Sequence, residues 1–232
     1  MQSMEENIVA TPDGSGTASE SGPGYFTTRF TRNDGRGQVW RHICDFLQTW
    51  IAGDADVLEL GAGWCDFSNA VHAGSVTAMD IDPVVQEAAG PAVAAVVGDC
   101  TDLSRFRDGS FDCVVASNLL EHLTRPMADT MLAEAQRVLR PGGRLLLIQP
   151  NFRLNPREYF DDYTHVSIYT DRSLRDYLAA SGWSVDHVAA RFLPLSMKSR
   201  GSGLTFLVPW YLRSPIKPFA GQMLVVASRG AM

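Results

Sequence analysis

One segment, VLELGAGWCDF at Val57 to Phe67, constrains the fold of this chain more than any other. It begins with a short, largely apolar run, which is typical of a buried strand in a parallel sheet. Gly61 and Gly63 follow, and they allow a sharp backbone turn where a side chain would block a ligand. Glu59 lies two residues before this turn. The segment therefore predicts a strand, a glycine turn and a site for a nucleotide-type cofactor.

The residue after this turn narrows the type of cofactor. A dinucleotide fingerprint, G-x-G-x-x-G, would place a third glycine at position 66, for helix packing and for the approach of a pyrophosphate. This chain has Asp66 there, and its negative charge would oppose a pyrophosphate. S-adenosylmethionine has no phosphate and has a cationic amino-acid end, so it suits an acidic loop better.

Four later segments also have strand patterns, and acids close two of them. Asp80 lies seventeen residues after Gly63 and can take the two ribose hydroxyls. Asp99 can accept a hydrogen bond from an adenine amino group. The fifth strand should follow a helix that closes on Gly142 and Gly143. The four segments are Ser75 to Asp82, Ala94 to Cys100, Phe111 to Leu123 and Pro141 to Phe152.

In this order and spacing, the segments resemble the class I S-adenosylmethionine-dependent methyltransferases, especially the small-molecule branch whose fourth strand runs into an E-H-L sequence. The resemblance covers roughly residues 25 to 229. It implies a Rossmann-like α/β fold, with a seven-stranded, mostly parallel sheet, helices on both faces and an antiparallel last strand. It also implies S-adenosylmethionine as the cofactor, bound by Tyr25, Arg29, Glu59, Gly61, Ala62, Gly63, Asp80, Ile81, Asp99, Cys100, Asn118 and Leu119.

Apolar periodicity and capping residues predict the remaining elements. Helices are expected over residues 39–51, 127–140 and 170–182, with Pro126 and Thr170 at two of their starts. The last two strands are expected over residues 184–195 and 221–229. Between them lies an apolar, basic insertion at about 197–218, for which a lid or dimer contact is favoured over contact with a membrane surface. The first 24 residues are predicted to be a disordered tail before a single domain at 25–232.

Candidate catalytic residues follow the fourth and fifth strands. His122 and His165 both leave the carboxyl edge of the sheet, and their imidazoles titrate in a range useful for removing a hydroxyl proton. Asp162, or its neighbour Asp161, could orient His165 or act as the base itself. For His122 the alternative is that E-H-L simply begins a helix. Glu121 and His122 have no third charged ligand nearby in the sequence, so a metal-independent enzyme is expected.

Composition excludes several other classes of protein. The net charge of −6 argues against general nucleic-acid binding, which needs a basic surface. The four cysteines show no metal-site spacing and are expected to be reduced thiols in a cytoplasmic protein. No signal peptide or membrane-spanning run is visible.

The sequence therefore predicts transfer of a methyl group from S-adenosylmethionine to a small molecule. A hydroxyl of a sugar, a nucleotide-sugar or a glycosylated natural product is favoured as the acceptor. Three alternatives stay open: N-methylation of an amino sugar or other small amine, an NAD-dependent oxidoreductase on a Rossmann sheet, and a non-catalytic S-adenosylmethionine-binding protein. A homodimer is also considered.

Overall fold

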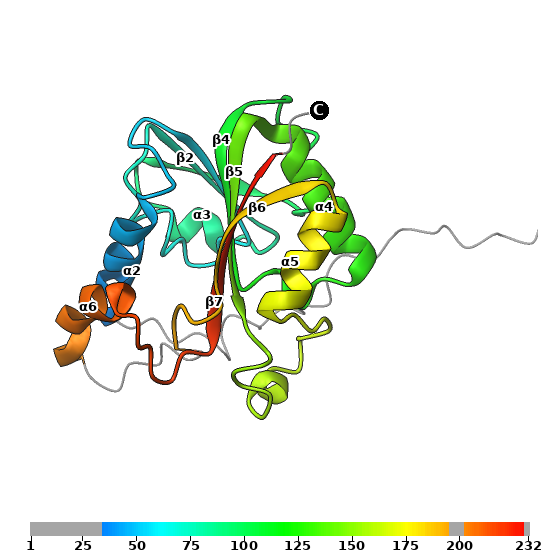
Figure 1. The fold of residues 1–232 in the computed structure, drawn as a ribbon. Coiled ribbons are helices and arrows are strands. Elements are labelled where there is room, and N and C mark those ends of the chain that lie inside the picture. Colours follow the sequence, from blue (N-terminus) through cyan, green and yellow to red (C-terminus); the bar gives the residue numbers. More distant parts are fainter. Residues whose placement is uncertain (1–33, 195–201, 230–232) are drawn as a thin grey trace, which may run out of the picture.

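A computed structural model describes residues 34–194 and 202–229 of the chain. The expected tail and the candidate cofactor residues Tyr25 and Arg29 lie outside these ranges. Within them, seven strands form one sheet with helices on both of its faces (Figure 1).

The sheet has the order β3-β2-β1-β4-β5-β7-β6. The strands β1 to β6 run in one direction, whereas β7 runs antiparallel to both of its neighbours, β5 and β6. The predicted fold class, with its antiparallel last strand, is confirmed. The strands are β1 (Asp56–Leu60), β2 (Ser75–Asp80), β3 (Val93–Val97), β4 (Phe111–Ser117), β5 (Leu139–Pro150), β6 (Trp183–Ala189) and β7 (Gln222–Arg229).

Helices cover the two faces because alternate strand residues point to opposite sides. Leu146 and Ile148 of β5 pack with α2 (Asp34–Leu47), while Leu145 and Leu147 pack with α4 (Arg125–Val138) and α5 (Asp171–Ala180). The short helix α3 (Val84–Ala88) lies over the β2 and β3 side. Both faces of the central strands are therefore buried, as parallel sheets require.

The three predicted helices are present with shifted bounds, since residues 39–51, 127–140 and 170–182 are observed as 34–47, 125–138 and 171–180. Ile43 and Leu47 of α2 are fully buried, as are Met131 and Ala135 of α4. Pro126 lies in the first turn of α4, where its missing N–H costs nothing. The side chain of Thr170 caps α5 and accepts a hydrogen bond from the backbone N–H of Ser173. A capping box thus fixes the start of this helix.

The structure corrects the predicted role of Gly142 and Gly143, and it ends two predicted strands earlier, at Ser117 and Ala189. These glycines do not close the helix, because α4 ends at Val138 and its C-cap is Leu139, which has an extended backbone. Leu139 pairs with Phe111 and Arg144 pairs with Cys113, so the residues between Leu139 and Arg144 form a bulge within β5. Gly142 supplies the left-handed backbone that this bulge contains, with φ of +77°.

The described part of the insertion contains η3 (Ser202–Leu207) and the short helix α6 (Val208–Arg213), which lies beside α2 (Figure 1). Leu212 is buried against the α2 face, whereas Trp210, Ile216 and Phe219 are exposed. The lid or dimer role of this segment stays a prediction. None of the helices in residues 34–194 and 202–229 is long and apolar enough to cross a membrane.

Candidate active site

The glycine turn after β1 is joined directly to the end of β2. Gly61 and Gly63 have φ of +69° and +49°, a conformation that glycine adopts at little cost. The backbone N–H of Gly63 donates to Oδ2 of Asp80 at 2.7 Å, and the N–H of Ala62 donates to the carbonyl of Met79 at 3.0 Å. Two segments predicted separately to bind the cofactor therefore form one edge of the sheet.

Gly61 is needed for a second reason, the approach of Leu119 from the loop after β4. A Cβ atom built at Gly61 would lie 3.0 Å from Cδ1 of Leu119. The loops after β1 and β4 are thus in van der Waals contact, as their predicted roles beside one cofactor require.

We expect Gly61→Ala to destabilise the protein by about 1 to 2 kcal/mol, because its left-handed φ is strained for alanine and its methyl group meets Leu119. Gly37→Ala is the matched control, since a Cβ at this α2 position has nothing within 4 Å and alanine is a better helix former than glycine. Urea unfolding of the two variants measures both effects. Equal stability of Gly61→Ala and the wild type would contradict this account of the turn.

Glu59 is buried behind the turn and holds the chain that follows it. Its Oε2 accepts hydrogen bonds from the N–H of Ser68 at 3.1 Å and from the Ser68 hydroxyl at 2.5 Å. Burial is the main cause that raises the pKa of Glu59 to about 8, against the smaller lowering effect of these bonds. The structure thus places Glu59 in support of the loop. Its predicted contact with the cofactor stays a proposal.

Glu59 should make stability depend on pH. Its carboxyl binds a proton more tightly in the folded state, so between pH of about 4.5 and 8 the free energy of unfolding falls as pH rises. The slope is at most about 1.4 kcal/mol per pH unit for one such group. In Glu59→Gln this contribution is absent. Urea unfolding of both proteins at several pH values checks the prediction, and parallel pH profiles would contradict it.

Asp66 forms an ion pair with Arg36 of α2. The guanidinium of Arg36 offsets the negative charge of Asp66. The charge of Asp66 is therefore no longer an argument against a pyrophosphate at this turn. The missing third glycine still separates this turn from a dinucleotide fingerprint. No feature of the sequence pattern linked these two residues, which are thirty positions apart.

The ends of β2 and β3 present the residues predicted to bind ribose and adenine. Asp80 is buried, and besides the N–H of Gly63 it accepts the N–H of Asp82 at 2.8 Å through Oδ1. Ile81 next to it is exposed, as a platform for an adenine ring would be.

Asp99 lies two residues beyond β3 and accepts hydrogen bonds from the N–H and hydroxyl of Thr101, both at 2.8 Å. Burial raises the pKa of Cys100 to about 12, so its thiol is neutral.

Asn118 marks the point where the chain leaves β4. It has φ of +52°, a conformation that asparagine tolerates better than most residues. Its Oδ1 accepts a hydrogen bond at 2.8 Å from Nε2 of Gln222, the first residue of β7. The position predicted to lie beside the sulfonium is therefore held by an antiparallel strand.

His122 and His165 meet in space, 43 positions apart in the sequence. Their ring centroids are 4.9 Å apart, His122 in the short helix η1 (Leu120–His122) and His165 in the loop between β5 and α5. This loop is bound to η1, because the N–H groups of Val166 and Ser167 donate to the carbonyl of Glu121 at 2.9 and 3.0 Å. The sequence prediction that both histidines leave the carboxyl edge is supported by this arrangement.

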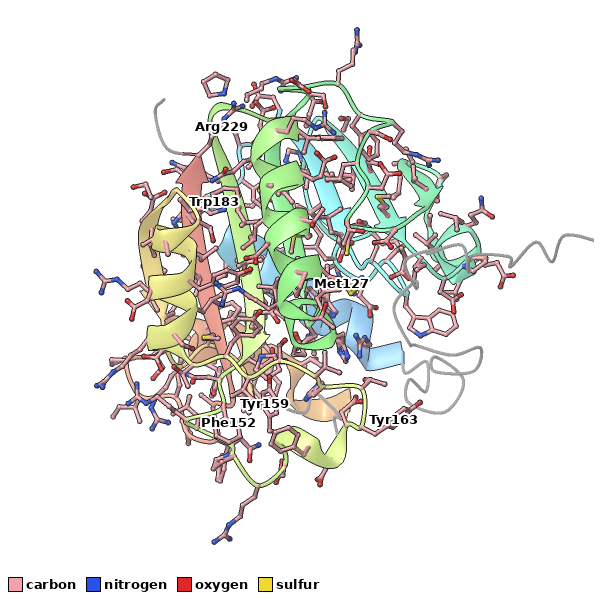
Figure 2. All side chains as sticks on the ribbon, turned by 90° about the vertical axis from the view of Figure 1, so that its right-hand side faces the viewer. Met127, Phe152, Tyr159, Tyr163, Trp183 and Arg229 are labelled. Carbon is pink, nitrogen blue, oxygen red and sulfur yellow. The ribbon has the colours of Figure 1, made fainter. Side chains whose placement is uncertain are left out.

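Aromatic residues of the same loop pack beneath His165. Tyr159, in the short helix η2 (Tyr159–Asp161), is buried, and its ring centroid lies 4.7 Å from that of His165. Figure 2 shows Phe152, Tyr159 and Tyr163 gathered at one end of the sheet, with Arg229 at the opposite end. Tyr159 thus anchors the loop that carries His165, whereas Tyr163 of the same loop is exposed.

Asp162 contacts the pair through Thr164. Its Oδ1 accepts the Thr164 hydroxyl at 2.6 Å, and this hydroxyl oxygen lies 2.9 Å from Nδ1 of His122. Nδ1 of His165 lies instead 2.6 Å from the carbonyl oxygen of Tyr159. Through Thr164, Asp162 is therefore connected to His122, whereas the Tyr159 carbonyl orients His165.

Sequence reasoning missed Glu121 as a site residue. Its carboxyl is almost fully buried, and its Oε1 lies 4.0 Å from Nε2 of both His122 and His165. Burial raises the pKa of this carboxyl to about 8. The expectation of a metal-independent enzyme considered only ligands near Glu121 and His122 in the sequence, whereas folding brings His165 to them. The sequence singled out His165 as a candidate base, but no pattern linked it to Glu121.

Comparison with known proteins agrees with this geometry. Residues 58–147 match a protein family described as methyltransferase domain. An uncharacterised methyltransferase of Mycobacterium avium is 36% identical over 110 residues, which are 42% of this chain and 43% of that protein. The ubiquinone/menaquinone biosynthesis C-methyltransferase UbiE of Ruegeria is 30% identical over 127 residues, 48% of each chain. The chain thus spans less than half the length of these curated relatives.

Solved structures share the fold. A S-adenosylmethionine-dependent methyltransferase from Methanosarcina mazei superposes with a TM-score of 0.58 at 17% identity, over 81% of this chain and 98% of that one. Geranyl diphosphate C-methyltransferase from Streptomyces coelicolor, solved with Mg²⁺, geranyl diphosphate and S-adenosylhomocysteine, gives 0.58 at 15% identity, over 81% and 77%. Residues 58–147 are therefore similar to methyltransferase domains, and the chain has the fold that S-adenosylmethionine-dependent methyltransferases share.

Proposed function

We propose that this protein transfers the methyl group of S-adenosylmethionine to a hydroxyl of a small molecule, at the carboxyl edge of the sheet. The observation that carries the proposal is the meeting of His122 and His165 beside Glu121, in the loops next to the glycine turn. A sugar, a nucleotide-sugar or a glycosylated natural product is the proposed acceptor, on the resemblance described above.

The proposed cofactor site uses the edge formed by β1, β2 and β3. The glycine turn would receive the methionine part, Asp80 the ribose hydroxyls, and Asp99 with Ile81 the adenine. Asn118 and Leu119 would then lie beside the sulfonium. The contacts from Gly63 to Asp80 and from Leu119 to Gly61 support this assignment, because they hold these residues at one continuous edge.

The chemistry is an in-line displacement. The acceptor oxygen forms a bond to the methyl carbon as the bond from that carbon to the sulfonium sulfur breaks, and S-adenosylhomocysteine leaves with the electron pair. Alignment and exclusion of water supply most of the rate. A hydroxyl must also lose its proton, and Nε2 of His165 can accept it because the Tyr159 carbonyl keeps the ring's other proton on Nδ1.

A second candidate is methylation of an acidic carbon. It is favoured by the similarity to UbiE, which is named as a C-methyltransferase. The same imidazole could remove a proton from carbon, so an acceptor screen has to include both kinds of compound.

Two measurements test the proposal. Calorimetry with S-adenosylhomocysteine should show one site per chain, and no binding at high micromolar ligand would refute the cofactor assignment. Transfer of a labelled methyl group should then be screened over sugars, nucleotide-sugars, phenols, amines and acidic carbon compounds. Turnover of amines alone would replace the hydroxyl proposal with N-methylation. Cofactor binding with no transfer to any class would indicate a non-catalytic binder.

A further inference from the structure

The three side chains of Glu121, His122 and His165 form a compact cluster of donor atoms. Oε1 of Glu121 lies 4.0 Å from Nε2 of His122 and 4.0 Å from Nε2 of His165. One ligand atom from each residue can be chosen so that all three lie within 4.8 Å of one another. We call these residues the Glu-His-His cluster.

Backbone contacts determine which nitrogen of each ring carries a proton. Nδ1 of His165 lies 2.6 Å from the carbonyl oxygen of Tyr159, and Nδ1 of His122 lies 3.2 Å from the carbonyl oxygen of Thr164. A carbonyl oxygen only accepts hydrogen bonds, so each Nδ1 must be the donor. In the neutral rings, Nε2 then carries a lone pair on the atom nearest Glu121. Histidines that bind metals in proteins are held in this way, by a hydrogen bond from the other ring nitrogen.

The carboxylate of Glu121 gives an independent reason to expect a cation. Its side chain is 1% exposed, and among the residues that the structure describes neither oxygen receives a hydrogen bond. An ionised carboxyl in such a place is costly without hydrogen bonds, a paired charge or a metal. The side chain is nevertheless directed at two imidazoles. A cation bound between the carboxylate and these two rings would compensate the carboxylate charge.

We propose that the Glu-His-His cluster binds one divalent transition-metal ion, such as Zn²⁺, through Nε2 of both histidines and the Glu121 carboxylate. Two ligand atoms that are each about 2.1 Å from a tetrahedral metal lie about 3.4 Å apart, so each 4.0 Å separation has to shorten by about 0.6 Å when the metal binds. Two imidazoles and one carboxylate favour zinc, iron, cobalt or nickel over Mg²⁺, which prefers oxygen ligands.

The cluster is well supported for this task. Hydrogen bonds from Val166 and Ser167 to the Glu121 carbonyl fix the loop of His165 to η1. The hydroxyl of Tyr159 donates to the carbonyl of Ser167 at 2.5 Å and closes the loop from its other side. Ligands on a backbone held in this way lose little freedom when a metal binds.

The inference rests on the proposed function for its position beside the acceptor, and it changes one role there. A metal bound at Nε2 of His165 would use the lone pair that otherwise accepts the proton, so the metal would promote loss of the hydroxyl proton by lowering the pKa of the bound hydroxyl. Three protein ligands leave at least one coordination position open, as catalytic zinc sites do. An acceptor with a hydroxyl next to a second oxygen, as in a sugar diol or a catechol, could occupy the open positions. Metal binding itself can be measured without any acceptor.

The test uses Co²⁺, whose d–d absorption reports the number and geometry of its ligands. The full chain, treated with a chelator and dialysed, should bind one Co²⁺ with visible bands, and Zn²⁺ should displace it whereas millimolar Mg²⁺ should not. Glu121→Gln and His165→Asn should each weaken Co²⁺ binding by at least about 100-fold, since loss of supporting residues alone costs 10- to 100-fold. His72→Asn is the control, because His72 is exposed and precedes β2 at the opposite edge of the sheet.

Calorimetry with S-adenosylhomocysteine is run on every variant as a check of folding that does not involve the metal. Absence of a stoichiometric Co²⁺ spectrum in the wild type would overturn the inference, as would equal Co²⁺ affinity in the wild type and Glu121→Gln. If S-adenosylhomocysteine binds but Co²⁺ does not, the metal inference alone fails, and the imidazole base of the proposed function remains. If Co²⁺ binds but S-adenosylhomocysteine does not, the cofactor assignment alone fails.

Discussion

Replacement of His165 with alanine should lower methyl transfer to a hydroxyl acceptor by about 100- to 10,000-fold, the range that a positioned proton acceptor contributes. The imidazole is held by the carbonyl of Tyr159 and packs against the rings of Tyr159 and His122, which fixes its position in the proposed site. Affinity for S-adenosylhomocysteine should change by less than about 3-fold, because His165 lies in the loop between β5 and α5, which carries none of the proposed cofactor residues. The measurement is kcat with the acceptor identified by the screen, together with calorimetry.

His72→Ala is the matched control for this variant. His72 is exposed and belongs to no part of the proposed site, so its replacement should leave kcat unchanged. If His165→Ala kept more than a tenth of the wild-type kcat, His165 would be neither the base nor an essential ligand. A loss of S-adenosylhomocysteine affinity as large as the loss of kcat would instead indicate that the loop had collapsed.

Asp80→Ala should weaken binding of S-adenosylhomocysteine by about 100-fold. The carboxylate accepts the backbone N–H groups of Gly63 and Asp82, and its removal leaves these buried donors without their partner. This loss destabilises the free and the bound protein alike, so it lowers stability more than affinity. The change in affinity comes from the proposed hydrogen bonds of the ribose hydroxyls to the charged carboxylate, because a loss of about 2.7 kcal/mol in total corresponds to 100-fold.

Asp54→Ala is a suitable comparison, because Asp54 is exposed and precedes β1 at the edge opposite the proposed site. Its affinity for S-adenosylhomocysteine should equal that of the wild type. Asp80→Asn adds a further test, since the amide keeps one oxygen acceptor but loses the charge, and it should bind with intermediate affinity. If Asp80→Ala bound the ligand as tightly as the wild type does, the ribose would have to lie elsewhere.

Much of this architecture could be predicted from the sequence because it follows from local patterns. The apolar period of α2 and α4, the capping threonine of α5 and the glycine turn after β1 each lie within one short segment. The errors of these predictions also arise within short segments. The glycines after α4 have the pattern of a helix end, but they form a bulge because β5 begins at Leu139 and pairs with Phe111 before them.

The Glu-His-His cluster could not be predicted in the same way. His165 lies in a loop without periodicity, and its position depends on hydrogen bonds to the backbone of Glu121, which any residue at that position could accept. The ion pair of Asp66 with Arg36 is likewise a tertiary contact with no local signal. Sequence patterns therefore located the strands that carry the site, whereas the packing of two loops determined which side chains meet.

The place of β7 in the sheet has a consequence for how the protein is made. This strand is synthesised after the other six, yet it lies between β5 and β6 and contributes Gln222 to the support of Asn118. On a ribosome, the first part of the chain to emerge can pair β1, β2, β3 and β4, but β6 has no neighbour until residues up to about Arg229 have left the exit tunnel. The acceptor side of the site should therefore be completed only after β7 has been synthesised, and nascent chains that stop before Gln222 should be good substrates for proteases and chaperones.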